Sequence, residues 1–142
     1  MAGKVKKSKS VASPVVMTDT LIFPNGEKYV GQYVKQSDKT ERQGTGVHYA
    51  SDGTEFSGIW VDDKLNGEGV IKYPDGSIYK GSLVNGEYSG KGEYTFSDGS
   101  KYLGNFTNNM MEGPSEFTDN EGRVWIGTFN GKKANGLTLK LS

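Results

Sequence analysis

The 142-residue sequence contains no cysteine, a single histidine and no long hydrophobic run. Without cysteine the chain can form neither disulfides nor thiolate metal sites. With one histidine and no cysteine, no nucleophile–base pair of the usual kind can be assembled, so we expect no enzyme. No stretch reaches the roughly 18 apolar residues of a membrane-spanning helix or resembles a signal peptide, and we therefore expect an intracellular protein.

Aliphatic residues are too scarce for a large core, because only 33% of the sequence is hydrophobic. Aromatic residues nevertheless make up 11% of the chain, and there are 21 glycines. A disordered chain would hold fewer aromatic residues, and a globular domain would hold more aliphatic ones. This composition favours a thin, repetitive β structure.

Charge is unevenly distributed along a chain that is neutral as a whole. Residues 1–18 contain no acidic residue and four lysines, which are Lys4, Lys6, Lys7 and Lys9. These four positive charges leave four excess negative charges on residues 19–142, which argues against a nucleic-acid-binding domain. We expect residues 1–18 to be a basic, disordered tail and residues 19–142 to be the folded domain.

An acidic or amide residue followed by glycine recurs along most of the sequence. The glycine of this pair falls at positions 26, 53, 76, 99 and 122. The intervals are 27, 23, 23 and 23 residues, so the chain consists of five units, the first with four extra residues. Self-similarity at a fixed period is the signature of a repeat architecture.

Each unit holds two strand patterns, and a short strand at Leu21–Phe23 precedes the first unit. The first pattern alternates aromatic, glycine and aromatic residues, as in Phe56-Ser-Gly58-Ile-Trp60. The second is a Gly-x-Gly pair followed by alternating apolar residues, as in residues 67–73. Because alternate residues of a strand share a face, the units predict antiparallel hairpins with one aromatic face. A strand glycine leaves space for a neighbouring side chain, so we expect the rings to tip over the glycines.

The rings of this face form our predicted partner-binding groove. They are Tyr29, Tyr33, Phe56, Trp60, Tyr73, Tyr79, Tyr94, Phe96, Tyr102, Phe106, Phe117, Trp125 and Phe129.

Three features could suggest other chemistry, and each has a simpler interpretation. His48 holds the repeat position taken by Ile71, Tyr94 and Phe117 in other units, so we interpret it as a structural residue of the groove. The Gly-x-Gly pairs lack the third glycine and the following helix of a phosphate loop. Asp62-Asp63 lacks the ligand spacing of a calcium loop. We therefore predict no catalytic residue, no metal site and no cofactor.

The segments between the two strands of a unit read as short polar loops, such as Val61–Asn66. The first unit departs from this pattern, because Gly44 follows Tyr33 by 11 positions, whereas the corresponding step is 7 positions in the other units. We interpret Lys35–Arg42 as an elongated charged hairpin whose role the sequence leaves open.

The spaced aromatic–glycine–aromatic motif, the Gly-x-Gly pair and the period of 23 resemble the MORN (membrane occupation and recognition nexus) repeat over about residues 21–141. That family often has a histidine immediately before the first glycine of the pair. This chain differs there, with Gln43, Asn66, Ser89, Glu112 and Asn135. The resemblance implies an all-β fold, an elongated, single-layer, twisted antiparallel sheet of stacked hairpins with a curved aromatic face. It also implies a scaffold in a cilium, flagellum (axoneme), cytoskeletal assembly or membrane setting.

Two function classes remain open at this stage. The first is a protein-binding scaffold that takes an extended or helical partner segment in the groove or a strand at an open sheet edge. Leu137, Leu139 and Leu141 alternate on the last strand and are the predicted edge contact, to a larger assembly or to a second copy in a homodimer. The second is a membrane-associated adaptor, in which the lysine tail and basic loops bind anionic phospholipids weakly.

Overall fold

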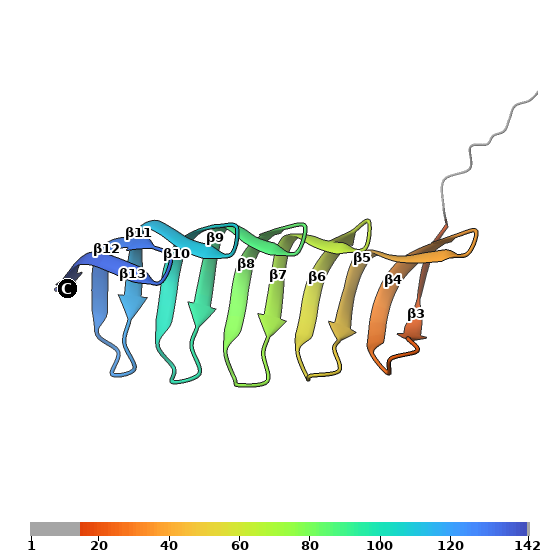
Figure 1. Ribbon diagram of the computed structural model, residues 1–142, viewed down its shortest axis with the longest axis horizontal. Coiled ribbons are helices and arrows are strands. Elements are labelled where there is room, and N and C mark those ends of the chain that lie inside the picture. Colours follow the sequence, from red (N-terminus) through yellow and green to blue (C-terminus); the bar gives the residue numbers. More distant parts are fainter. Residues whose placement is uncertain (1–14, 142) are drawn as a thin grey trace, which may run out of the picture.

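In the computed structural model, residues 15–141 are described and form one antiparallel sheet of eleven strands without a helix (Figure 1). Strand order in the sheet follows the order in the chain. The strands are β3 Val16–Ile22, β4 Lys28–Gln36, β5 Lys39–Tyr49, β6 Glu55–Val61, β7 Lys64–Lys72, β8 Ile78–Val84, β9 Glu87–Thr95, β10 Lys101–Thr107, β11 Met110–Thr118, β12 Val124–Asn130 and β13 Lys133–Leu139. This arrangement confirms the predicted all-β, elongated, single-layer fold.

The first strand is longer than the sequence predicts. β3 begins at Val16, inside the segment that we expected to be tail, and ends at Ile22 rather than Phe23. It pairs with β4 without interruption, from Val16 opposite Val34 to Ile22 opposite Lys28. The four lysines of the predicted tail lie outside the described residues.

Two kinds of turn alternate along the sheet and form two rows, one along each side (Figure 1). The first kind is the predicted Asp-Gly turn, of which residues 73–77 are an example. Gly76 N donates to Tyr73 O over 3.0 Å, and Tyr73 N donates to Ser77 O over 2.9 Å. The Asp75 carboxylate accepts hydrogen bonds from the hydroxyl and the backbone N–H of Ser77, which lower the pKa of Asp75.

The second kind is a two-residue turn at the far end of each hairpin, which we call the hairpin tip. The tips are residues 37–38, 62–63, 85–86, 108–109 and 131–132. Asn85 and Gly86 both have positive φ, 49° and 82°, as a type I′ turn requires. The predicted polar loop at Val61–Asn66 is therefore wrong. The strands continue to the tip, and Val61 pairs with Lys64.

Each hairpin bends where its register shifts. In the β6–β7 pair, Gly58 lies opposite Gly69, but Trp60 lies opposite Leu65, so β7 carries extra residues in a bulge. A bulge bends the strand and increases the local twist. In three units a tyrosine hydroxyl closes this bend by donating to the carbonyl three residues on, as Tyr79 does to Ser82 O over 2.6 Å. The bends curl the tips over the aromatic face, as the upper row of Figure 1 shows.

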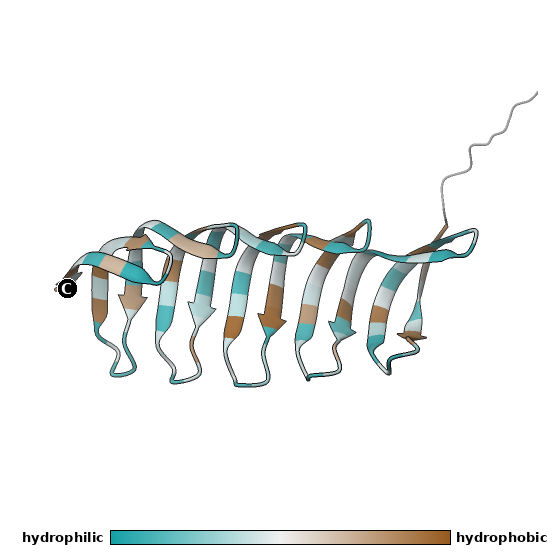
Figure 2. Ribbon diagram, viewed as in Figure 1, coloured by the Kyte–Doolittle hydropathy of each residue, from teal (hydrophilic) through white to brown (hydrophobic). Residues whose placement is uncertain are grey.

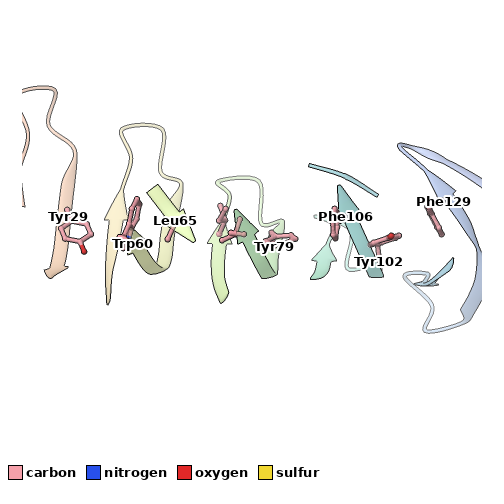
Figure 3. Packing of buried hydrophobic residues seen from close by; sticks show 9 residues of the cluster. Tyr29, Trp60, Leu65, Tyr79, Tyr102, Phe106 and Phe129 are labelled. Carbon is pink, nitrogen blue, oxygen red and sulfur yellow. The ribbon is translucent and has the colours of Figure 1, made fainter. Parts of the chain in front are cut away.

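The core is a single row of side chains along the sheet (Figure 3). Tyr79, which has 0% exposure, shows how the rings use the glycines. A Cβ atom built on Gly92 would lie 2.5 Å from the Tyr79 hydroxyl and 2.7 Å from its Cε1. The predicted tipping of rings over glycines is therefore present. Hydrophobic and hydrophilic residues alternate along the strands (Figure 2), which leaves the opposite face of the sheet open to solvent.

Candidate functional site

The thirteen predicted groove residues fall into two classes by burial. Six are fully buried and hold the sheet together; they are Tyr29, Trp60, Tyr79, Tyr102, Phe106 and Phe129. Seven are half-buried and line an accessible surface; they are Tyr33, Phe56, Tyr73, Tyr94, Phe96, Phe117 and Trp125. Only the second class presents much of its surface to a binding partner.

Sequence reasoning missed one groove position in every unit, because it lies in the segments interpreted as polar loops. The residues at this position are Arg42, Leu65, Tyr88, Met111 and Ala134, and each pairs with the second aromatic or leucine of its unit. The Asn85-Gly86 dipeptide is the sequence signal from which the place of Tyr88 in the groove could have been predicted. An Asn-Gly two-residue turn fixes the hairpin register and so places Tyr88 opposite Leu83.

The C-terminal half of the groove contains an open, apolar hollow of about 610 Å³, which we call the C-terminal pocket. One wall consists of residues at and beside the hairpin tips, and the other consists of half-buried rings near the end of β9, directly after β9, and near the end of β11. The residues at and beside the tips are Tyr88, Asn109, Met110, Met111, Gly131 and Lys132, and the facing rings are Tyr94, Phe96 and Phe117. Lys132 is the only charged residue among those that line this pocket.

Stacked rings fix the shape of the C-terminal pocket. Tyr88 lies parallel to Tyr79, with ring centroids 3.8 Å apart and an interplanar angle of 3°. Phe106 meets the Tyr88 ring edge-on at 5.5 Å. Phe96 bridges to Tyr94 at 4.9 Å and to Phe117 at 6.2 Å. Such aromatic contacts form a rigid, preorganised surface.

Tyrosine hydroxyls at the edge of this pocket are paired with each other. The hydroxyls of Tyr73 and Tyr88 contact one another. Burial raises the pKa of both phenols, that of Tyr88 strongly. Both therefore remain neutral near neutral pH, and the pocket stays free of phenolate charge.

The N-terminal half of the groove is polar, because it contains a cluster of Glu27, Arg42, His48 and Asp63. The ring of His48 lies between Arg42, whose Nη1 is 3.1 Å from Nδ1, and Glu27, whose Oε1 is 2.8 Å from Nε2. A guanidinium can only donate, so Nδ1 accepts and Nε2 carries the hydrogen that Glu27 accepts. His48 is buried, and both of its ring nitrogens are engaged in hydrogen bonds within the groove.

Arg42 is the central member of this polar cluster. Its Nε donates to Asp63 Oδ1 over 2.6 Å, and its Nη2 donates to Asp63 O over 2.8 Å. Its guanidinium carbon lies 4.1 Å from the ring centre of Trp60, as in a cation–π contact. The cluster borders two adjoining hollows of about 390 and 480 Å³. These hydrogen bonds join the β4–β5 hairpin to the β6–β7 hairpin, and we call the contact of Arg42 with Asp63 the latch.

We expect Glu27 to make stability depend on acid pH. The hydrogen bond from His48, with a second from the Ser51 N–H, holds the pKa of Glu27 at about 2 instead of 4.5. Because the folded-state pKa is the lower one, this stabilisation is complete above pH 4.5 and is lost as pH falls toward 2. Glu27→Gln should therefore lower the melting temperature clearly at about pH 6 and much less at about pH 3.

The control for this experiment is Glu87→Gln at an exposed position, which should change the melting temperature little at either pH. An equal loss from Glu27→Gln at both pH values would contradict the account.

The predicted edge residues lie at the C-terminal end of the sheet. Leu139 pairs with Trp125, and Leu137 packs against Gly127, so both lie on the groove face, whereas the repeat pattern assigned that face to Thr138. The register of β13 is shifted by one residue from that of the other units, so that Leu137 rather than Thr138 lies over the glycine. Leu137 and Leu139 are 44% and 38% exposed, and Leu141, which lies beyond β13, is 83% exposed. Their role as an edge contact stays a prediction.

Two further searches concern residues 15–141 only. No group of three or more histidine, cysteine or acidic side chains there is arranged to hold a metal ion. None of the described segments is a helix of the length and apolarity that crossing a membrane requires.

A search of the curated proteins found no match. Among solved structures, the chain is similar to one described as "SAS-4 (dCPAP) TCP domain in complex with a Proline Rich Motif of Ana2 (dSTIL) of Drosophila Melanogaster". The identity is 14%, 99% of each chain is covered, and the TM-score is 0.37, so this likeness carries no argument about function.

The family comparison identifies the repeat itself. The model of the MORN repeat matches residues 56–78, 79–101 and 102–119. These matches are consecutive and follow the 23-residue period, each beginning at the first ring of a unit. MORN repeats are protein- or membrane-binding repeats. Residues 56–119 therefore form three consecutive MORN repeats, as the sequence pattern predicted.

Proposed function

We propose that this protein is a non-catalytic scaffold that binds a protein partner by taking its large apolar side chains into the C-terminal pocket. The observation that carries the proposal is the open row of half-buried rings formed by Tyr94, Phe96 and Phe117, which no described segment of the chain covers. Rigid aromatic side chains in a concave site are typical anchors of protein interfaces.

The lining of the pocket indicates the chemistry of the partner. Phenylalanine, tyrosine and methionine side chains accept leucine, isoleucine, methionine or phenylalanine, and methionine adapts to differences in shape. Lys132 at the rim favours an acidic residue next to these anchors. A partner segment that is extended or helical can present such side chains on one face.

Charge makes this proposal preferable to a membrane adaptor. The described residues carry 13 basic and 17 acidic side chains, so the folded part opposes binding to an anionic surface. The four lysines that would favour a membrane lie outside the described residues. The proposal also includes a ciliary, flagellar or cytoskeletal setting, which family resemblance alone supports. It includes an edge contact at β13 as well, which the exposed leucines there support.

We expect Phe117→Lys to abolish binding of the partner. Phe117 is half-buried in the pocket wall, and a lysine there would place a charge where the partner inserts apolar groups. Losses of tenfold or more are usual when an anchor site is disrupted (about 2 kcal/mol). Capture of partners on the immobilised full chain, quantified by mass spectrometry, provides the measurement.

The matched control is Leu103→Lys, because Leu103 is 50% exposed on the opposite face of the neighbouring strand. Both variants should keep the β-sheet circular dichroism spectrum of the unaltered chain. A partner lost by Phe117→Lys and retained by Leu103→Lys supports the proposal. The same set of captured proteins for both variants would contradict it.

A further inference from the structure

Each hairpin tip after the first contacts the bent strand of the preceding hairpin through one backbone hydrogen bond. Asp63 N donates to Arg42 O over 3.0 Å, and Gly86 N donates to Leu65 O over 2.8 Å. The same contact joins Asn109 N to Tyr88 O over 3.0 Å and Gly131 N to Met111 O over 2.8 Å. The tips thus form a continuous second row, visible along the top of Figure 1.

Side-chain hydrogen bonds reinforce the junctions in the N-terminal half. At the first junction the Asp63 carboxylate accepts from the backbone N–H and the guanidinium of Arg42. Gln43 Oε1 also accepts from Asp62 N over 2.9 Å. At the second junction Asn66 and Asn85 bind reciprocally, over 2.9 Å from Asn85 N and over 3.3 Å from Asn66 Nδ2.

This reinforcement decreases toward the C-terminus. The third junction has a single side-chain bond, from Tyr88 N to Asn109 Oδ1 over 2.8 Å. At the fourth junction, between the tips of β10–β11 and β12–β13, the described residues form no side-chain hydrogen bond. Glu112 and Gly131 stand at the repeat positions of Asn66 and Asn85, and glycine has no side chain with which to return a bond.

The least reinforced tips are the ones that form a wall of the C-terminal pocket. Asn109, Met111, Gly131 and Lys132 line it from the tip side, opposite Phe96 and Phe117. Local opening of a protein occurs first where few bonds must be broken. We propose that the β12–β13 tip is a moving wall, which opens at the fourth junction to admit the partner's apolar side chains and then closes on them. This inference rests on the proposed function, because it describes how the same pocket is entered.

The repeat supplies its own test, which is to graft the second junction onto the fourth. The double substitution Glu112→Asn with Gly131→Asn places asparagines at the repeat positions of Asn66 and Asn85. Gly131 N already donates to Met111 O, so the bond that the graft adds is the one between the two side-chain amides, as from Asn66 Nδ2 to Asn85 Oδ1. Gly131 has φ 66° and Asn85 has φ 49°, so the site already has the left-handed backbone that asparagine tolerates. The graft adds a side chain on the tip side of the pocket, where a Cβ atom at position 131 would lie 3.1 Å from Met110 Cε, and it leaves the facing rings of Phe96 and Phe117 unchanged.

Two measurements on the full chain report on the wall. Amide hydrogen exchange at position 131 of the unaltered chain should be faster than at positions 63 and 86, and the graft should slow it about tenfold. The apolar dye 8-anilinonaphthalene-1-sulfonate should enter the pocket of the graft more slowly, by a similar factor, in stopped-flow fluorescence. Asn66→Ala, which weakens the second junction, should speed exchange at position 86 and leave dye entry unchanged.

The outcomes separate this inference from the proposed function. Equal exchange at positions 63, 86 and 131 would overturn the moving wall whatever the pocket binds. Dye entry at an unchanged rate in a graft whose exchange has slowed would also overturn it, while leaving the pocket as a binding site. Dye binding that is unaffected by Phe117→Lys would instead count against the pocket itself, and the exchange data alone would then decide whether the wall moves.

Discussion

Gly81→Val is expected to unfold the middle of the sheet. A Cβ atom at this position would lie 2.5 Å from both Gly92 Cα and Lys91 O, and 3.0 Å from the Tyr79 hydroxyl. The first two are backbone atoms of the neighbouring strand, so no change of side-chain rotamer relieves the overlap. Overpacking usually costs about 1–3 kcal/mol where side chains can adjust, and here we expect on the order of 4 kcal/mol.

Thermal unfolding followed by circular dichroism measures this loss. The control is Lys80→Val, which places the same side chain one residue earlier, on the exposed face of the same strand. It should change the free energy of unfolding by less than about 0.5 kcal/mol. If Gly81→Val melted at the temperature of the unaltered chain, our account of the paired glycines would be wrong.

Trp60→Ala should have the second largest effect, because it removes a large ring from the core. Trp60 is 4% exposed and meets the Tyr29 ring edge-on at 5.7 Å. Its Nε1 donates to Gly46 O over 3.0 Å, and the substitution would leave that carbonyl without this bond. Truncations of this kind cost about 3 kcal/mol or more, which corresponds to a fall in melting temperature on the order of 10 °C.

Ile59→Ala provides the comparison, because Ile59 precedes Trp60 on the opposite face and is 48% exposed. We expect a much smaller loss of stability for it in the same denaturant titration. Equal losses for the two variants would show that the sheet has no preferred core face.

The period of 23 residues predicts the fold because each period contains both strand patterns and shows which side chains share a face of the sheet. In Phe56-Ser-Gly58-Ile-Trp60 the alternation is visible within five residues, and the structure places these residues on one strand with the expected faces. β3 was harder to predict, because Val16–Thr20 has no aromatic–glycine pattern. Its extent is set instead by pairing with the full length of β4.

The site could be predicted only in part, for reasons that lie in the bends. A single apolar residue such as Leu65, between Lys64 and Asn66, shows no alternation of its own, so its burial follows from the bulge rather than from a pattern. The same bends decide which rings are covered, and sequence alone could not separate buried Tyr79 from half-buried Tyr94. The charge of Arg42 likewise hid its place in the groove, because its partner Asp63 is distant in sequence.

Strand order that follows chain order makes this molecule a one-dimensional array, in which every strand pairs by hydrogen bonds only with its neighbours in sequence. Folding then requires no distant loop closure, and ordered structure can spread from one hairpin to the next. Cooperativity depends on the coupling between adjacent units, which is strongest where the junctions are most reinforced. Fluctuations from the native state should therefore begin at the C-terminal units and stop at the latch formed by Arg42 and Asp63.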